Sequence, residues 1–302
     1  MFKRVAICGA AGQLGHELSR VFEAAGCQLL RLVRAQLDLT NGALVESTLA
    51  GFEPDLVINA AAYNMVDVAE REPQAAFQVN ALAVRNLAIA CRQLDARLVH
   101  FSTDYVFDGT KGTSYVEEDP THPLGAYAVS KLAGEIYAQA YLDAPLIIRT
   151  SGVFGPRGMG TARGNFVELM LRLAAGGQPI RVVEDHVASP TYAPALAERT
   201  LEMVRAGLTG VYHAGGGSPM SWYEYARLIF FTAGLAPELR ATNEREYRTA
   251  ARRPRFSALS NARMERAGIT PMPPLPDAVR QYLTNREAQA SASGVAGTAR
   301  AR

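Results

Sequence analysis

The sequence has few of the residues that mark metal-binding and disulfide-bonded proteins. Its 302 residues include three cysteines, Cys8, Cys27 and Cys91, whose spacing fits neither a metal-ligand nor a disulfide pattern. The five histidines also lack metal-ligand spacing, so we assign no metal site. Such sparse cysteines favour a reducing compartment.

Long apolar runs and an excess of one charge are missing as well. No apolar stretch approaches the ~18 residues of a membrane helix. The N-terminal MFKRVAICGAAG lacks the long apolar region and the small-residue cleavage site of a signal peptide. With 31 basic and 29 acidic residues, the net charge of +2 gives no reason to expect nucleic acid or an anionic membrane as a partner. We therefore expect a soluble, cytoplasmic protein.

Short β-rich runs alternate with helical stretches through the first half of the chain. VAICGA is followed by the helical GHELSRVFEAAG, and LLRLV is followed by LVESTLAGF, before DLVINAAA and RLVHFSTDYVF continue the alternation. This order predicts a parallel sheet with helices on both faces. The strands are apolar almost throughout, as in a sheet that is buried on both sides.

The pattern loosens after about residue 155. Helical stretches such as NFVELMLRLAAGG and PMSWYEYARLIFFTAG are separated there by short strands such as IRVVED. Residues 286–302, REAQASASGVAGTARAR, are small, polar and low in complexity. We expect them to form a disordered tail.

A glycine-rich turn follows the first predicted strand. Residues 8–15, CGAAGQLG, place Gly9, Gly12 and Gly15 between that strand and a helix. Glycines let a pyrophosphate approach the helix N-terminus, where free N–H groups and the helix dipole favour an anion. A tight turn that binds nothing would have the same spacing, but the strand–turn–helix context that a dinucleotide site requires is present.

Two further segments fit a dinucleotide. Asp38, in LDLT, lies where a loop could bind adenine, and the small residues of 59–63 (NAAAY) let a cofactor approach a strand end. The stretch after the second strand carries Arg31 and Arg34 but no clear acidic residue for a ribose 2′-hydroxyl. Arg34 could instead meet a 2′-phosphate, which favours NADP over NAD, although both arginines also fit a solvated surface.

Tyr127 lies four residues before Lys131 in PLGAYAVSKLAGE, so a helix would place both side chains on one face. A neighbouring ammonium favours the phenolate and lowers a phenol pKa that starts near ~10. A phenol tuned in this way can transfer a proton at neutral pH. Taken alone, the spacing also fits an amphipathic helix with a surface lysine.

The segment LVHFSTDYVFDG runs from a strand into a loop at Thr103 and Asp104. In open parallel sheets, ligands bind beyond the carboxyl ends of the strands. Thr103 can hydrogen-bond a substrate oxygen there, and Asp104 can orient or protonate. The helix of Tyr127 is the next element, so we expect Tyr127 and Lys131 to face Thr103 across a bound nicotinamide.

Motifs over about residues 3–283 resemble those of the dTDP-4-dehydrorhamnose reductase family of extended short-chain dehydrogenases/reductases. In family order they are GAAGQLG, LDLT, VINAAAYNMVDVAEREP, VNALA, HFSTDYVFDG, YAVSKLAGE, IIRTSGVFG, NFVELML, ASPTYAPALA, GVYHAGGGSPMSWYEYA and RRPRFSALS. The resemblance implies an α/β fold, with a Rossmann-type doubly wound parallel sheet and a small C-terminal α/β substrate-binding domain. It implies an NADP-binding domain over residues 1–155, to which part of the later chain returns, and a mainly substrate-binding region over 156–285.

The resemblance also implies an activity. This is the NADPH-dependent reduction of the C4 ketone of dTDP-4-dehydro-L-rhamnose, or of a closely related dTDP-4-keto-6-deoxysugar, in nucleotide-sugar and cell-surface polysaccharide biosynthesis. Tyr127 would donate the proton, Lys131 would lower its pKa and hold the nicotinamide ribose, and Thr103 and Asp104 would contact the substrate. The residues assigned to the cofactor are Gly12, Gln13, Leu14 and Gly15 at the phosphates, Asp38 and Leu39 at adenine, and Ala61, Ala62 and Tyr63 along the ribose–nicotinamide path. NADH stays open as the alternative cofactor, and a homodimer is a family-level expectation.

Three stretches depart from the usual family pattern. Ala128 follows Tyr127 where glycine is common, and residues 185–191 read DHVASPT instead of Asp-Gln-x-Gly-x-Pro-Thr. Gly152 follows Arg-Thr-Ser where a tryptophan is common. That tryptophan is expected to pack near the sugar, so its replacement leaves the identity of the substrate open.

Several polar and aromatic residues fit either a site or a structural role. Asp67 and Glu70 either orient a loop or are solvated, and Trp222 either packs or stacks on thymine. Three arginines of ARRPRFS either meet a substrate diphosphate, which suits their planar forks, or form a basic surface loop: Arg252, Arg253 and Arg255.

Other functions use the same fold. One is a nucleotide-sugar epimerase or 4,6-dehydratase, but related dehydratases place an acidic pair at the Thr103 loop, where Tyr105 follows Asp104 here. Another is a non-catalytic NADP-binding regulatory subunit resembling that of methionine adenosyltransferase, because its relatives can retain the tyrosine and the lysine. Turnover of a nucleotide keto-sugar separates the enzymes from the regulatory subunit.

Overall fold

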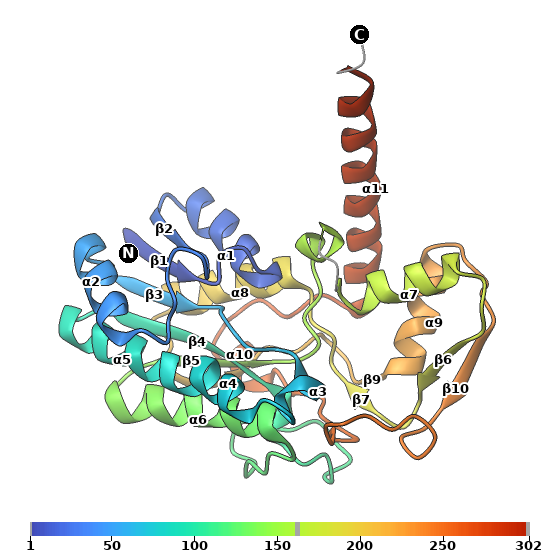
Figure 1. The fold of residues 1–302 in the computed structure, drawn as a ribbon, viewed down its shortest axis with the longest axis horizontal. Helices are drawn as coiled ribbons and strands as arrows, with labels where there is room; N and C mark the ends of the chain where they lie inside the picture. Colours follow the sequence, from blue (N-terminus) through green and yellow to red (C-terminus); the bar gives the residue numbers. More distant parts are fainter. Residues whose placement is uncertain (1, 161–163, 300–302) are drawn as a thin grey trace.

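A six-stranded parallel sheet forms the larger part of the molecule, with a smaller region beside it (Figure 1). The structure, a computed structural model, describes residues 2–160 and 164–299, and for residues 160 and 289–299 it describes the backbone alone. The strand order is β2-β1-β3-β4-β5-β8. The strands are β1 (Arg4–Cys8), β2 (Gln28–Leu32), β3 (Leu56–Asn59), β4 (Arg97–Thr103), β5 (Leu146–Thr150) and β8 (Gly210–His213).

Both faces of this sheet are buried. Alternate side chains of β1 enter different hydrophobic clusters, Val5 and Ile7 on one face and Ala6 and Cys8 on the other. The strand order turns back between β1 and β3, which is where open α/β sheets bind ligands. The prediction of a Rossmann-type doubly wound sheet is confirmed.

Helices cover the two faces in separate layers (Figure 1). On one face α1 packs against α8, and on the other α5 packs against both α2 and α6. The bounds are α1 (Gln13–Ala24), α2 (Gly42–Phe52), α5 (Ala83–Leu94), α6 (Ala126–Tyr141) and α8 (Ala193–Arg205). Because α8 and β8 come from the second half of the sequence, the later chain supplies a covering helix and the last strand.

Short helical turns lie close to the strand ends. They are α3 (Val66–Ala69), α4 (Pro73–Phe77), the π-helical turn η1 (Gln78–Leu82), and the 3₁₀ turns η2 (Asp104–Val106) and η3 (Pro156–Gly160). The turn η1 leads into α5 and lies close to α6, because a Cβ atom on Gly134 would be only 2.2 Å from the carbonyl oxygen of Asn80. Isolated π-turns of this kind are frequent at functional sites.

The smaller region lies at the right of Figure 1. It contains a parallel pair of strands, β10 and β6, and an antiparallel pair, β7 and β9. Helix α9 begins with a capping box of Ser221 and Glu224 and packs against α7 and α11, while α10 packs against β8. The bounds are α7 (Phe166–Ala175), β6 (Ile180–Val183), β7 (Val187–Ala188), β9 (Met220–Ser221), α9 (Trp222–Thr232), β10 (Leu239–Thr242), α10 (Ala262–Arg266) and α11 (Leu275–Ala299).

The end of the chain differs from the disordered tail predicted for residues 286–302. Helix α11 continues to Ala299, and residues 300–302 lie outside the described part of the chain. The start of this helix is anchored, since Tyr282 is buried and Arg286 pairs with Glu168 at 2.9 Å. Beyond the anchor, alanine, glutamate and glutamine have high helix propensity, so an already nucleated helix propagates through them.

Two kinds of feature are absent from residues 2–160 and 164–299. None of the helices there combines the length and the apolar character that crossing a lipid bilayer requires. The same residues contain no group of three or more His, Cys, Asp or Glu side chains arranged to hold a metal ion.

Candidate active site

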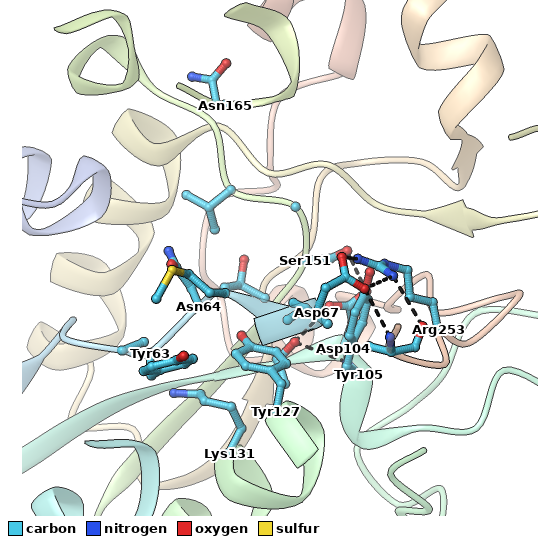
Figure 2. A pocket seen from close by; sticks show the side chains of 18 of the residues that line it. Tyr63, Asn64, Asp67, Asp104, Tyr105, Tyr127, Lys131, Ser151, Asn165 and Arg253 are labelled. Carbon is cyan, nitrogen blue, oxygen red and sulfur yellow. Dashed lines mark hydrogen bonds and ion pairs between the residues drawn. The ribbon is translucent and has the colours of Figure 1, made fainter. Parts of the chain in front are cut away.

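A large cleft, with a volume of about 2130 Å³, runs along the carboxyl ends of the parallel strands. Its walls come from the glycine turn after β1, the ends of β3, β4 and β5, the start of α6, and much of the segment 244–255 of the smaller region. The cleft therefore lies between the two regions and at the switch point of the sheet, where this fold class binds ligands. Figure 2 shows the part around Tyr127.

The glycine turn passes directly against the end of β3. Gly9 has a φ of +77°, and a Cβ atom there would lie 2.7 Å from the amide nitrogen of Ala61. Gly12 is the N-cap of α1, and no side chain caps that end of the helix. Gln13 and Leu14 follow on the cleft wall, and N–H groups in a first turn have no acceptor inside the helix. This terminus therefore suits an anionic phosphate.

Gly15, predicted to meet the cofactor phosphates, packs against the glycine turn itself. It does not line the cleft, because a Cβ atom there would lie 2.1 Å from the carbonyl oxygen of Gly9. It allows α1 to pack closely against the turn. The side chain of Gln13 is also used within the protein, since its Oε1 accepts hydrogen bonds from the Gly155 N–H (3.1 Å) and Asn165 Nδ2 (3.0 Å). These bonds tie the start of α1 to the smaller region.

At the predicted adenine end, Arg34 is available to a ligand and Arg31 is not. Arg31 forms an ion pair with Glu23 at 2.8 Å. Arg34 is exposed on the cleft wall and forms no ion pair with any residue that the structure describes. The Asp38 carboxylate accepts hydrogen bonds from the N–H (3.0 Å) and hydroxyl (2.8 Å) of Thr40, and chiefly the first of these lowers its pKa. Asp38 therefore shapes its own loop as well as bordering the cleft.

Asn80 in η1 holds the segment that follows β3. Its Oδ1 accepts the Tyr63 N–H at 2.8 Å, and its Nδ2 donates to the Tyr63 carbonyl at 3.0 Å. The same amide donates to Ser130 Oγ at 2.9 Å, and the Ser130 hydroxyl donates to the Tyr127 carbonyl at 2.7 Å. Sequence reasoning missed this link, for which the polar residue in VNALA was the only signal. Ala61 and Ala62, predicted to line the same path, lie on the cleft wall with Tyr63, as does Leu39, which was predicted to meet adenine.

Helix α6 presents Tyr127 and Lys131 to the cleft (Figure 2). Its first turn is capped from another element, because Glu70 Oε1 accepts the Ala126 N–H at 2.7 Å. A Cβ atom on Gly125 would lie 2.5 Å from that oxygen, so only glycine fits without displacing it. Of the two roles left open for Glu70, the structure shows the orienting one.

The Lys131 ammonium is buried beside β4. Its Nζ donates to the carbonyl oxygen of Phe101 at 2.6 Å. Burial lowers the pKa of Lys131 to about 8, and the negative charge of Glu135 partly opposes that fall. A pKa of about 8 leaves most of the lysine protonated at neutral pH, so a cation lies one helical turn from the Tyr127 phenol.

Glu135 is itself paired within the core. Arg149 of β5 donates from Nε to Oε1 at 3.0 Å and from Nη2 to Oε2 at 2.8 Å. Both side chains are buried, and the two parallel bonds form the fork that guanidinium and carboxylate groups favour. Lys131 is therefore not the partner that neutralises Glu135.

Thr103 and Asp104 are buried at the end of β4 and line the cleft. Asp104 accepts three hydroxyl hydrogen bonds, from Thr103 at 3.1 Å, from Ser151 at 2.8 Å and from Ser257 at 2.5 Å. No basic side chain in the described ranges forms an ion pair with it. Burial raises the pKa of Asp104 to about 6, even though the hydroxyls favour the charged form. Ser257 lies 153 residues away in the sequence, so no local pattern could have indicated it.

Tyr105 lies against the predicted proton donor. Its ring meets that of Tyr127 edge-on, with the centroids 6.1 Å apart and the planes at 88°. Burial, followed by the charge of Asp104, raises the pKa of the Tyr105 phenol. Tyr105 therefore remains a neutral phenol that supports the Tyr127 ring.

The three arginines of residues 251–257 have different surroundings. Arg253 pairs with Asp67, and Arg255 pairs with Glu244. Arg252 is exposed on the cleft wall and forms no ion pair with any residue in the described part of the chain. Of the three, Arg252 is the one free to meet a diphosphate.

Trp222 both packs and borders the cleft. Its ring lies against Phe166, with centroids 4.7 Å apart. Gly152 has a φ of +48°, and a Cβ atom there would lie 3.2 Å from the Trp222 ring. A larger side chain at position 152 would therefore need a strained backbone and a shift of that ring.

The chain is similar to known proteins over most of its length. Residues 3–288 match the family model described as "RmlD substrate binding domain". The Spore coat polysaccharide biosynthesis protein SpsK of Bacillus subtilis is 36% identical over 283 residues, which cover 94% of this chain and 98% of that protein. A dTDP-4-dehydrorhamnose reductase of Mycobacterium tuberculosis is 40% identical over 276 residues, which cover 89% of each.

A solved structure is also closely similar. The dTDP-4-dehydrorhamnose reductase of Bacillus anthracis, crystallised in complex with NADP, superposes with a TM-score of 0.89 at 32% identity, covering 94% of this chain and 99% of that one. These matches span both the sheet and the smaller region, and they confirm the resemblance on which the sequence motifs depend. The chain belongs to the RmlD substrate-binding domain family.

Proposed function

We propose that the protein reduces the C4 ketone of dTDP-4-dehydro-L-rhamnose, or of a closely related dTDP-4-keto-6-deoxysugar, with NADPH as the hydride donor. The observation that carries the proposal is the shared cleft, in which Tyr127, Lys131 and Thr103 line a wall that continues to the glycine turn. The relatives named dTDP-4-dehydrorhamnose reductase support the reaction. The protein is an NAD(P)-dependent oxidoreductase of this reductase type.

The residues on the cleft wall fit a dinucleotide with a 2′-phosphate. The uncapped start of α1 offers N–H groups to a pyrophosphate, and the exposed Arg34 offers a cation soon after β2. An arginine at this place accommodates a 2′-phosphate in related nucleotide sites. The NADP complex of the Bacillus anthracis relative supports the same cofactor. NADPH supplies the hydride when bound.

The chain's own residues supply placement and a proton. The Tyr127 phenol donates its proton to the ketone oxygen as negative charge develops there. The buried Lys131 ammonium favours the phenolate that results. Thr103 is held at the wall by its hydrogen bond to Asp104, and its hydroxyl would exchange that bond for one to the substrate oxygen.

The sugar nucleotide would lie toward the smaller region. Arg252 on the cleft wall suits a diphosphate, and Trp222 and Gly152 border the part of the cleft beyond the end of β5. Such a product would feed polysaccharide synthesis, and the Bacillus subtilis relative is named a spore coat polysaccharide biosynthesis protein. The homodimer and the cytoplasmic location stay predictions.

The test is NADPH oxidation by the purified protein with several nucleotide keto-sugars, each with NADPH and with NADH. We expect oxidation with dTDP-4-keto-6-deoxysugars, faster with NADPH than with NADH, and none without a keto-sugar. A protein that binds NADPH but turns over no nucleotide keto-sugar would contradict the proposal and favour the regulatory reading.

A further inference from the structure

One ion pair crosses the cleft beside Tyr127. Asp67 belongs to α3 on the sheet side, and Arg253 belongs to the segment between β10 and α10, 186 residues later. Arg253 donates from Nη2 to Oδ2 at 2.7 Å and from Nη1 to Oδ1 at 3.0 Å. Asp67 Oδ1 also accepts the Ala251 N–H at 3.0 Å. Three hydrogen bonds therefore hold residues 251–253 to the sheet side (Figure 2).

This ion pair is more shielded from solvent than an ordinary surface ion pair. The Arg253 side chain is 25% exposed and the Asp67 side chain 44% exposed. The Arg253 fork is the main cause of the lowered pKa of Asp67. A bidentate guanidinium–carboxylate contact also fixes direction, which a single bond to a flexible lysine does not.

Arg253 reaches the proton donor through Tyr105. The guanidinium also lies beside the Tyr105 phenol, close enough to oppose the rise that burial causes in the pKa of that phenol. Tyr105 in turn meets the Tyr127 ring edge-on. Figure 2 shows Asp67, Arg253, Tyr105 and Tyr127 on the same side of the pocket. A change in the Arg253 contacts would therefore be passed to the ring that carries the reacting hydroxyl.

Two other ion pairs formed by arginines show how the pair of Asp67 and Arg253 differs. The pair of Arg255 and Glu244 lies within one segment of the smaller region and joins nothing across the cleft. The pair of Arg263 and Glu118, 3.6 Å apart, does join the later chain to a loop of the sheet side, but neither residue lines the cleft.

We propose that Arg253 is a positioning residue for the reduction. Held by Asp67, it closes the wall between the two regions and fixes Tyr105 against Tyr127, so that the phenol points at the substrate oxygen. The inference rests on the proposed function for its kinetic readout.

The main test is a double-mutant cycle between Arg253 and Tyr105 in the full chain. Arg253→Lys keeps the charge but loses the fork, so we expect kcat to fall about tenfold while the NADPH dissociation constant changes less than about twofold. In a Tyr105→Phe background, Arg253→Lys should have little further effect, because both changes act through one contact. Additive losses in kcat, or an unchanged kcat in Arg253→Lys, would overturn the inference.

Asp67→Asn provides the second arm, with Glu118→Gln as its matched control. Both remove the carboxylate charge from an ion pair between the sheet side and a later arginine, but only Asp67 borders the cleft. We expect a lower kcat in Asp67→Asn and wild-type kcat in Glu118→Gln. Equal kcat values in the two variants would contradict the inference.

Amide hydrogen exchange of residues 244–257 separates this inference from the proposed function, because it needs no turnover. We expect faster exchange there in Asp67→Asn than in Glu118→Gln, and equal exchange would overturn the positioning role. A wild-type protein without ketoreductase activity would contradict the proposed function alone.

Discussion

Two buried carboxylates near α6 are stabilised in opposite ways. Glu135, in the layer beneath the cleft, meets the Arg149 guanidinium through two parallel hydrogen bonds. Asp104, at the cleft wall, meets three hydroxyls and no cation within the described part of the chain. The pKa of Asp104 is accordingly raised to about 6 by burial.

The difference shows that one buried carboxylate stabilises the fold, whereas the other borders the proposed reaction site. Below the strand ends, a buried charge is cancelled by an opposite charge, which fixes α6 to β5. At the strand ends, hydroxyls hold the carboxylate in place without cancelling its charge, so its proton affinity stays sensitive to what binds beside it. The buried Lys131, with a pKa lowered to about 8, shares this second property.

The largest effect should follow from breaking the supporting pair. Arg149→Met leaves Glu135 buried without its cation, which typically costs about 3–5 kcal/mol in the free energy of unfolding. Urea denaturation measures this loss in the free energy of unfolding. The double variant Glu135→Met and Arg149→Met should recover most of the loss, because no charge is then left alone. A single variant as stable as the wild type would show that Glu135 needs no partner.

Titration of Asp104 should make the free energy of unfolding depend on pH. Folding raises the pKa of Asp104 from its ordinary 3.8 to about 6, so the folded state binds its proton more tightly than the unfolded state. Its contribution to the free energy of unfolding must then fall, by about 3 kcal/mol, as the pH rises from about 4 to about 6, and level off above that.

The measurement is the difference in unfolding free energy between the wild type and Asp104→Asn across this pH range, which removes the contribution of other groups. A difference that is flat, or that rises with pH, would mean that Asp104 is stabilised as a charge in the way that Glu135 is.

Removal of the Tyr127 hydroxyl should slow catalysis and leave the stability of the fold unchanged. Tyr127→Phe is expected to lower kcat by ~10²-fold or more, as loss of a general acid does, with NADPH binding and unfolding free energy close to wild type. Single-turnover reduction of a keto-sugar measures it. Wild-type turnover would remove Tyr127 from its proposed role.

The smallest effect concerns the cofactor's 2′-phosphate. Arg34→Ala should raise the KM for NADPH about tenfold and leave that for NADH unchanged, since one exposed cation is lost from one phosphate. Arg31→Ala is the matched control, because that arginine is already paired with Glu23. Equal effects of the two variants on NADPH would argue against a specific contact by Arg34.

Features encoded by neighbouring residues could be predicted from the sequence. The glycine turn, the strand ends at Thr103 and Asp104, and the spacing of Tyr127 and Lys131 each depend on a few consecutive positions, and these residues line one cleft. The close packing of Gly15 against Gly9 was not predictable, because spacing alone does not distinguish a glycine that faces a ligand from one that allows close packing.

Contacts between distant segments could not be predicted. The Ser257 hydroxyl on Asp104 and the Arg253 fork on Asp67 depend on how the smaller region is placed against the sheet, which no local pattern encodes. The α11 extension was missed for another reason. Its low-complexity composition predicts disorder, whereas the helix anchored at Tyr282 continues to Ala299.

The most direct test is a crystal structure with NADP and the reduced sugar nucleotide bound together. The account predicts the sugar O4 within ~3 Å of the Tyr127 hydroxyl, hydrogen-bonded to Thr103, with C4 facing the nicotinamide. A complex in which the sugar ring lies away from the Tyr127 phenol, or in which the pyrophosphate does not reach the start of α1, would contradict it.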